Sequence, residues 1–486
     1  RLHIPDGIID NCSFNGTYTN ELVKGKGFDD PNSVVKLIGF KGDYKEIPFT
    51  MDSAIINDFT KPIASGVFKA NFPLEKLNNC VDKDLMAFSK GNANVEFQFK
   101  ADIVDFEITK PFVSGLVKIN NGDMRYVPRN LVFKNTNVAL NFTDKDLFIS
   151  NIRLQSGKSI VNMEGSIQNF LNLYYTVPEK LVLNWKVTSP QLYLGEFLGF
   201  LENRKAVKPT PTKTKKGNGN DKLNFLFEKS NVALTVQIDK FYYNKFTATN
   251  TKAELLLSDS GIAIRNAVVN HAGGQVKLSG SVQQGKARNH FSMKANVSNV
   301  AIEKFFYAFN DFDMESLKSK NLKGYLTTAA VISGNISNEG KLIPKSMNGT
   351  VGFTLKNGAL LKFGPIKSAG KFAFPFRDLD TITFSNLKGN LDINGEKITI
   401  YPMQINSSVL NMDVAGIYSF GKGTNIALDV PLRNPKNDKD ITDKEKLEER
   451  RNRGIVLHLL ASDGDDGKIK IRLVSKKKRN EEVDLK

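Results

Sequence analysis

Apolar and polar residues alternate along most of the chain. The alternation is regular at residues 95–99, 138–142 and 398–400, and it recurs from one end of the sequence to the other. Successive side chains of a β-strand point to opposite faces, so each such stretch predicts a strand with one apolar and one polar face. We therefore predict a nearly all-β protein.

Four dipeptides between the predicted strands favour tight turns. They are Asn121-Gly122, Asn357-Gly358, Asn394-Gly395 and Asp463-Gly464. Asn, Asp and Gly tolerate the positive φ that a two-residue hairpin requires. We predict hairpins at these positions and an antiparallel meander for the sheet.

One strand pair recurs three times. Each copy contains an alternating strand that leads to a glycine, at Gly165, Gly280 and Gly416. Gly280 follows Gly165 by 115 residues, and Gly416 follows Gly280 by 136 residues. Such repetition predicts stacked copies of one supersecondary unit rather than several separate globular domains.

Short apolar stretches with helical spacing follow the strands. They lie at residues 192–201 and 300–309, with a related fragment at 72–77. Apolar side chains three and four positions apart lie on one face of a helix. We therefore predict a few short helices at the seams between repeats.

Two segments interrupt the alternation. Residues 202–222 are rich in Lys, Pro, Thr, Gly and Asn, which predicts a flexible linker or loop, and residues 433–453 carry dense mixed charge, which predicts a solvated loop or helix. The chain then divides into the end of a preceding unit (1–90), repeat unit 1 (91–201), the linker (202–222), repeat unit 2 (223–320), repeat unit 3 (321–432), the charged segment (433–453) and C-terminal strands with a basic tail (454–486).

The formal net charge is +17, which raises the question of a nucleic-acid or membrane partner. The lysines are spread over alternating strands, as at Lys118 and Lys277, instead of gathering into one basic helix. This spacing fits the solvent side of a sheet and argues against nucleic acid. The basic run at residues 476–479 is concentrated, and we predict a solvated tail there.

No stretch of the sequence approaches the ~18–20 apolar residues that span a membrane, and no signal pattern follows Arg1. We therefore expect any membrane anchor to lie outside this chain. The two cysteines, Cys12 and Cys80, are too few for a disulfide scaffold. They are expected to be ordinary buried residues, with a single bridge in an oxidising compartment as the alternative.

Catalytic and metal-binding patterns are absent from the sequence. The four histidines, His3, His271, His290 and His458, are far apart and have no partner at ligand spacing. The sequence has no Walker loop, no GxGxxG after a strand and no GxSxG elbow. We therefore expect no enzymatic activity, no cofactor and no metal ion.

A further pattern links the third repeat to a known family. It comprises the Gly-strand motif at residues 348–351 and the strand pair at 387–393 and 395–398, within a region from Lys323 to Leu432. In this region the chain resembles the AsmA-like family of bacterial envelope proteins, and the likeness extends more weakly over residues 93–309. The resemblance implies an elongated, curved antiparallel sheet built from repeats, a β-groove that is apolar on its concave side.

The resemblance also implies a function. AsmA-like proteins look like bridge-type conduits that carry phospholipid across the periplasm and support outer-membrane biogenesis, held in the inner membrane by a preceding helix. We therefore expect a periplasmic protein whose partner is phospholipid or another acyl lipid, with further partners among envelope proteins. The predicted apolar groove face contains Leu140, Phe142, Ile149, Leu255, Leu257, Ile264, Ile393, Ile398 and Ile400.

Elementary packing supports the same expectation. A long sheet with one apolar face must cover that face with a second layer, with another molecule or with an apolar ligand. The few short helices predicted are too few to cover three repeats. The alternative function is a structural or interaction scaffold of the envelope, whose apolar face docks a protein partner or a second copy.

Overall fold

The computed structural model divides the chain into two compact units. The first comprises Arg1–Ile238 and Glu254–Ser260, and the second comprises Asp239–Ala253 and Gly261–Lys486. The structure describes residues 1–4, 7–105, 107–127, 131–177, 180–201, 231–258, 260–285, 287–314, 316–337, 340–367, 377–432, 441–451, 454–464 and 469–482.

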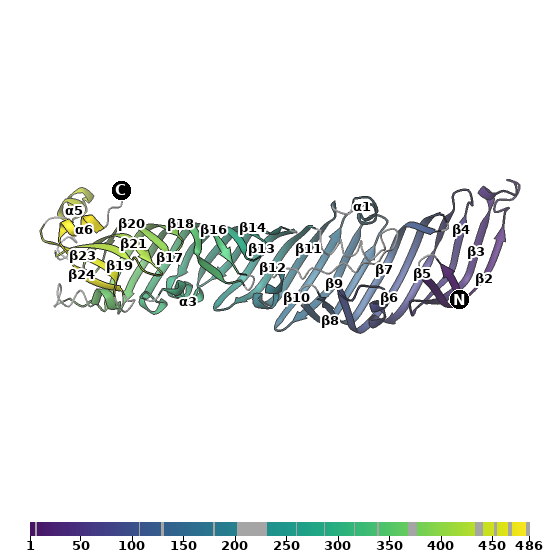
Figure 1. Cartoon of the computed structure of the whole chain (residues 1–486), viewed down its shortest axis with the longest axis horizontal. Coiled ribbons are helices and arrows are strands. Elements are labelled where there is room, and N and C mark those ends of the chain that lie inside the picture. Colours follow the sequence, from purple (N-terminus) through teal and green to yellow (C-terminus); the bar gives the residue numbers. More distant parts are fainter. Residues whose placement is uncertain are drawn as a thin grey trace. The chain divides into compact units, whose positions relative to one another are not determined.

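The first unit is an antiparallel sheet in which strands pair in chain order from β1 to β11 (Figure 1). Its strands are β1 (Leu2–Ile4), β2 (Gly7–Thr19), β3 (Val34–Tyr44), β4 (Ile47–Asn57), β5 (Ile63–Pro73), β6 (Met86–Val104), β7 (Glu107–Tyr126), β8 (Leu131–Phe142), β9 (Leu147–Ser156), β10 (Ser159–Ile167) and β11 (Val182–Tyr193). Both β12 (Asn231–Tyr243) and β13 (Phe246–Ser258) contribute residues to each unit.

The second unit repeats this plan, with antiparallel pairing in chain order from β14 to β24. Its strands are β14 (Gly261–His271), β15 (Gly274–Gln283), β16 (Asn289–Ala301), β17 (Leu322–Ile336), β18 (Leu342–Leu361), β19 (Thr381–Asn394), β20 (Lys397–Asn406), β21 (Asn411–Ser419), β22 (Asn425–Pro431), β23 (Val456–Asp463) and β24 (Ile469–Leu473). No pairing among these described strands joins β24 back to β14, so the sheet stays open. The antiparallel, mostly β class predicted from the sequence is confirmed.

Helices are few and short. They are the 3₁₀ turns η1 (Asp30–Asn32), η2 (Leu74–Asn79), η5 (Leu194–Leu201), η6 (Asn310–Asp313) and η7 (Ser319–Asn321), and the α-helices α1 (Phe170–Thr176), α3 (Ile302–Ala308), α5 (Lys444–Arg451) and α6 (Lys476–Glu482). The three helical stretches predicted from apolar spacing correspond to η2, η5 and α3, which follow β5, β11 and β16. Two of these three are 3₁₀ turns.

The recurring strand pair is present as β9–β10, β14–β15 and β20–β21. In each pair the motif glycine lies opposite an isoleucine, and the partners are Ile149 with Gly165, Ile264 with Gly280 and Ile400 with Gly416. The register shifts immediately beside each of these isoleucines. The sequence repeat is therefore a repeat of one hairpin with one bulge at a fixed place.

The motif glycines also explain how these strands bend. Gly280 and Gly416 have φ of 152° and 144°. A Cβ at either position would collide with a backbone carbonyl oxygen of the next strand, that of Ser292 or Asn425. A strand can bend this closely over its neighbour only where no side chain intervenes.

Two of the four predicted hairpins are wrong. Asn121-Gly122 lies inside β7 and Asn357-Gly358 lies inside β18, and each asparagine has a positive φ, 52° and 49°. Both dipeptides are bulges that the backbone of the preceding strand approaches closely. A Cβ on Gly91 would lie 2.7 Å from the Cα of Gly122, and a Cβ on Gly324 would lie 2.8 Å from the Cα of Gly358. Positive φ serves a bulge as well as a turn. Asn394-Gly395 does form the turn from β19 to β20, and Asp463-Gly464 begins the connection from β23 to β24.

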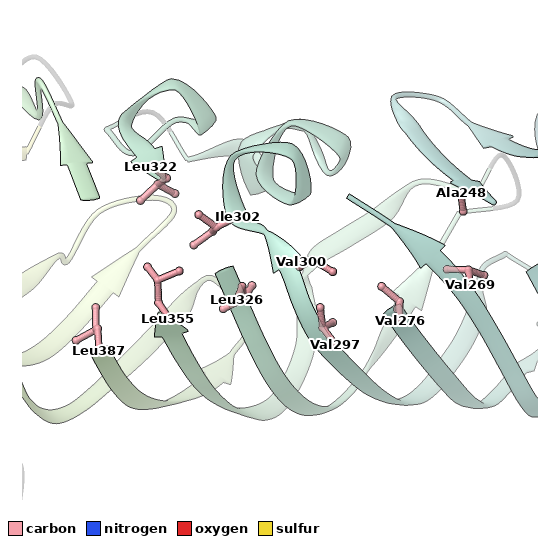
Figure 2. Packing of buried hydrophobic residues seen from close by; sticks show 10 residues of the cluster. All are labelled: Ala248, Val269, Val276, Val297, Val300, Ile302, Leu322, Leu326, Leu355 and Leu387. Carbon is pink, nitrogen blue, oxygen red and sulfur yellow. The ribbon is translucent and has the colours of Figure 1, made fainter. Parts of the chain in front are cut away.

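The hydrophobic core of the second unit lies along one rim of the sheet. Its largest cluster contains Ala248, Val269, Val276, Val297, Val300, Ile302, Leu322, Leu326, Leu355 and Leu387. Figure 2 shows the strand residues of this cluster on the inside of the bend of the strands, beneath the helix that Ile302 begins. Phe305 and Phe306 of the same helix pack against the cluster. The apolar side of the sheet is therefore concave at this seam.

The remaining sequence predictions have mixed outcomes. The charged segment contains the helix α5, as predicted, whereas the linker at 202–222 lies outside the described residues. In the basic run at 476–479 the three lysines are exposed, as expected of a solvated segment, but the run belongs to α6, and its Arg479 is ion-paired to Asp429 at 2.9 Å. Cys12 and Cys80 are free and partly buried rather than fully buried. Burial raises the pKa of the Cys80 thiol, with Lys45 acting in the opposite direction.

Candidate functional site

Apolar residues form continuous rows across the strands of the second unit. In one row the successive cross-strand partners are Ile264, Gly280, Met293, Ile332, Gly349, Ile393, Ile398 and Tyr418. The next row contains Leu278, Ala295, Ala330, Val351, Leu391, Ile400 and Gly416. Directly opposed residues of an antiparallel sheet share a face, as do residues two apart on a strand. Strands β14–β21 thus share one apolar face, which we call the apolar face of the second unit.

The opposite face of these strands is polar. One of its rows contains Ser279, Lys294, Val331, Thr350, Asp392 and Thr399. Lys277 is exposed on this face, between Val276 and Leu278 of the apolar one. The scattered lysines noted in the sequence include side chains on the solvent side of the sheet, where they oppose pairing with other chains.

Burial differs along the apolar face. Near the rim, Leu326, Leu355 and Leu387 are only 3–9% exposed (Figure 2). Two and three rows away, Val351 and Met293 are partly exposed. Because α3 is only seven residues long, it covers the rim and not the width of the face. The described residues therefore cover only part of the apolar face.

The first unit carries a matching face. One row contains Val95, Val117, Leu140, Ile149, Gly165 and Trp185, and another contains Phe68, Phe97, Gly115, Phe142, Leu147 and Ile167. The indole of Trp185 lies over Gly165, where a Cβ would be 2.6 Å from Cε3. The helix α1 covers one end of this face through Phe170 and Leu173. We call this surface the apolar face of the first unit.

The nine predicted groove residues fall into three groups. Leu140, Phe142 and Ile149 lie together on the apolar face of the first unit, and Ile264, Ile393, Ile398 and Ile400 lie on that of the second. Leu255 and Leu257 share one face of β13 by alternation. All nine are partly exposed, which distinguishes them from the fully buried residues at the rims.

Sequence reasoning missed several members of the two faces. Phe97, Met293, Ile332 and Val351 lie in the same rows, Phe353 lies two positions from Val351 on the same face, and their strands also alternate. Counting alternation in every strand would have found them. The register that joins them depends on bulges, such as the one beside Ile264, which alternation does not reveal.

Two histidines have environments that their sequence neighbours did not indicate. His271 is 6% exposed and stacks on Phe246 with ring centroids 4.4 Å apart. Its Nδ1 lies 2.6 Å from the carbonyl oxygen of Thr247, and its buried Nε2 has no hydrogen-bond partner. Burial lowers the pKa of His271, and Lys304 adds to the effect. His458 has an acidic partner after all, because its Nδ1 lies 2.6 Å from Asp429.

The described residues contain no group of three or more His, Cys, Asp or Glu side chains that could hold a metal ion. None of the helices among them is both long and apolar enough to cross a membrane. The most extensive chemical feature on the described strands is the pair of apolar faces.

No protein-family model, curated protein or solved structure matches the chain.

Proposed function

We propose that the apolar faces bind the acyl chains of phospholipid, and that the protein conducts such lipid between the inner and outer membranes of a bacterial envelope. The observation that carries this proposal is the apolar face of the second unit, continuous over β14–β21 and partly exposed. The periplasmic location, the membrane anchor outside this chain and the role in outer-membrane biogenesis rest on the AsmA-like sequence resemblance.

Length and energy both suit an acyl chain. Eight strands at about 4.8 Å spacing give a row of about 34 Å, whereas one leaflet of a bilayer core is about 15 Å thick. One row is therefore long enough for more than one acyl chain in line. Burying half of such a chain, about eight methylenes, is worth about 6 kcal/mol. An apolar surface of suitable shape is enough to bind an acyl chain, and no cluster of polar side chains is required.

The test places a carboxylate on the apolar face. Met293→Asp should reduce the amount of phospholipid that co-purifies, because an ion facing an acyl chain loses its hydration without gaining a partner. Ser292→Asp is the matched control, since Ser292 is the exposed neighbour on the polar face of the same strand. Native mass spectrometry of the gently purified chain measures bound lipid, and circular dichroism checks that each variant folds.

The outcomes separate the two candidate functions. Equal amounts of lipid bound to wild type and to Ser292→Asp, and less lipid bound to folded Met293→Asp, support the proposal. A lipid-free wild-type dimer that Met293→Asp dissociates would favour the docking scaffold instead. Val351→Asp, in the adjacent row, repeats the test at a second position if Met293→Asp unfolds.

A further inference from the structure

The loop that joins β2 to β3 displays apolar side chains to solvent. This β2–β3 loop, residues 20–33, lies in the first unit and belongs to neither apolar face. Phe28 is 73% exposed, and Leu22 and Val23 are each 45% exposed. Three large apolar side chains in one short loop form an exposed cluster of the kind that marks an interaction site.

The buried side chain of Asn32 forms hydrogen bonds that hold the loop in this conformation. Asn32 is 7% exposed, and its Oδ1 accepts a hydrogen bond from the backbone N–H of Val23 at 2.8 Å. Its Nδ2 donates to the carbonyl oxygens of Val23 at 3.1 Å and Gly27 at 2.7 Å. The backbone N–H of Leu22 donates to the carbonyl of Asn32 at 2.8 Å. These hydrogen bonds hold the loop in a conformation in which the three apolar side chains are exposed.

The acidic and the basic side chains of the loop differ in their position and in their contacts. Glu21 accepts a hydrogen bond from the N–H of Gly25 at 3.0 Å, and Asp29 accepts one from the N–H of Asn32 at 3.0 Å. Lys24 and Lys26 are fully on the surface, and within the described parts of the chain neither forms an ion pair. Residues 22–28 therefore carry two ammonium groups and no carboxylate beside the apolar side chains, whereas Glu21, Asp29 and Asp30 flank this stretch.

We propose that the β2–β3 loop is a membrane-docking element, which inserts Leu22, Val23 and Phe28 into the surface of a bilayer containing anionic phospholipid. Lys24 and Lys26 then contact lipid phosphates, since apolar insertion and electrostatic attraction together give stable attachment at an interface. This goes beyond the proposed lipid conduction, because the loop is separate from both apolar faces and can attach the protein whether or not those faces carry lipid.

The experiment is flotation of the full chain with vesicles of phosphatidylethanolamine and phosphatidylglycerol. The triple variant Leu22→Ser, Val23→Ser, Phe28→Ser should bind at least about tenfold more weakly, because each apolar side chain withdrawn from water contributes to affinity. Lys24→Glu with Lys26→Glu should weaken binding to these vesicles and leave binding to phosphatidylcholine vesicles unchanged. Neither set touches a buried residue, so folding is preserved.

The matched control is Val104→Ser, Val331→Ser, Leu342→Ser, which removes aliphatic residues that are 54%, 49% and 55% exposed elsewhere. This control and Met293→Asp should both float like the wild type. Loss of lipid binding on the apolar face can therefore be distinguished from loss of membrane docking by the loop. Equal flotation of the loop variant and the wild type overturns the proposal, as does a wild type that does not float. A wild-type dimer that the loop variant dissociates, without flotation, assigns the loop to a second copy and also overturns it.

Discussion

Single residues account for where the strands bend and bulge. Asn121 and Asn357 have positive φ inside long strands, and each precedes a glycine that another strand approaches closely. The same Asn-Gly pair forms a true turn at Asn394-Gly395. Sequence predicts the positive φ in both settings, but it does not decide between a bulge and a hairpin, since both require that φ.

His271 should make stability depend on pH. Burial lowers its pKa below the ordinary value of 6.5, so the unfolded chain binds the proton more readily than the folded one. The stabilising contribution is therefore present above pH 6.5 and is lost as the pH falls below that value. We expect the melting temperature to drop between pH 7.5 and pH 5.5 by more in the wild type than in His271→Gln. An equal drop in both proteins would show that folding does not shift the pKa of His271.

At the scale of elements, α6 should detach when its ion pair is removed. Arg479 and Asp429 are largely shielded, with side chains 25% and 19% exposed, so their contact should contribute about 1–2 kcal/mol, between the values of exposed and buried pairs. Arg479→Ala should speed hydrogen exchange of the α6 amides. Lys477→Ala, at a side chain that is 88% exposed, is the control and should leave their exchange unchanged. Unchanged exchange in Arg479→Ala would mean that other contacts hold the helix.

Elements whose signal is local were predictable, and those held by distant partners were not. Alternation located the strands, and three-and-four spacing located α3, because both patterns reside within the element itself. The basic run in α6 looked solvated because its partner Asp429 lies on β22, far back along the chain. Likewise, Leu140 and Ile149 could be placed on one face from sequence, whereas the row from Ile264 to Ile398 required the registers of six successive strand pairs.

For the molecule as a whole, lipid binding should raise stability by mass action. A ligand at about 100 times its dissociation constant adds about 2.7 kcal/mol to the free energy of unfolding. We expect the delipidated chain to melt at higher temperature when a short-chain phosphatidylcholine is added below its micellar concentration. Met293→Asp should reduce this shift and Ser292→Asp should keep it. A shift of equal size in Met293→Asp would place the lipid elsewhere than on the apolar face.

Pairing in chain order has a consequence for biosynthesis. In each unit a strand's hydrogen-bonded partners are its immediate predecessor and successor, so no strand must wait for a distant segment to be made. Closure entropy then stays small for most pairings, because most connections between successive strands are short. We expect the sheet to assemble hairpin by hairpin as the polypeptide emerges, with each new strand completing the exposed edge left by the one before it. A nascent chain stalled after β16 should already protect the amides of β14 and β15.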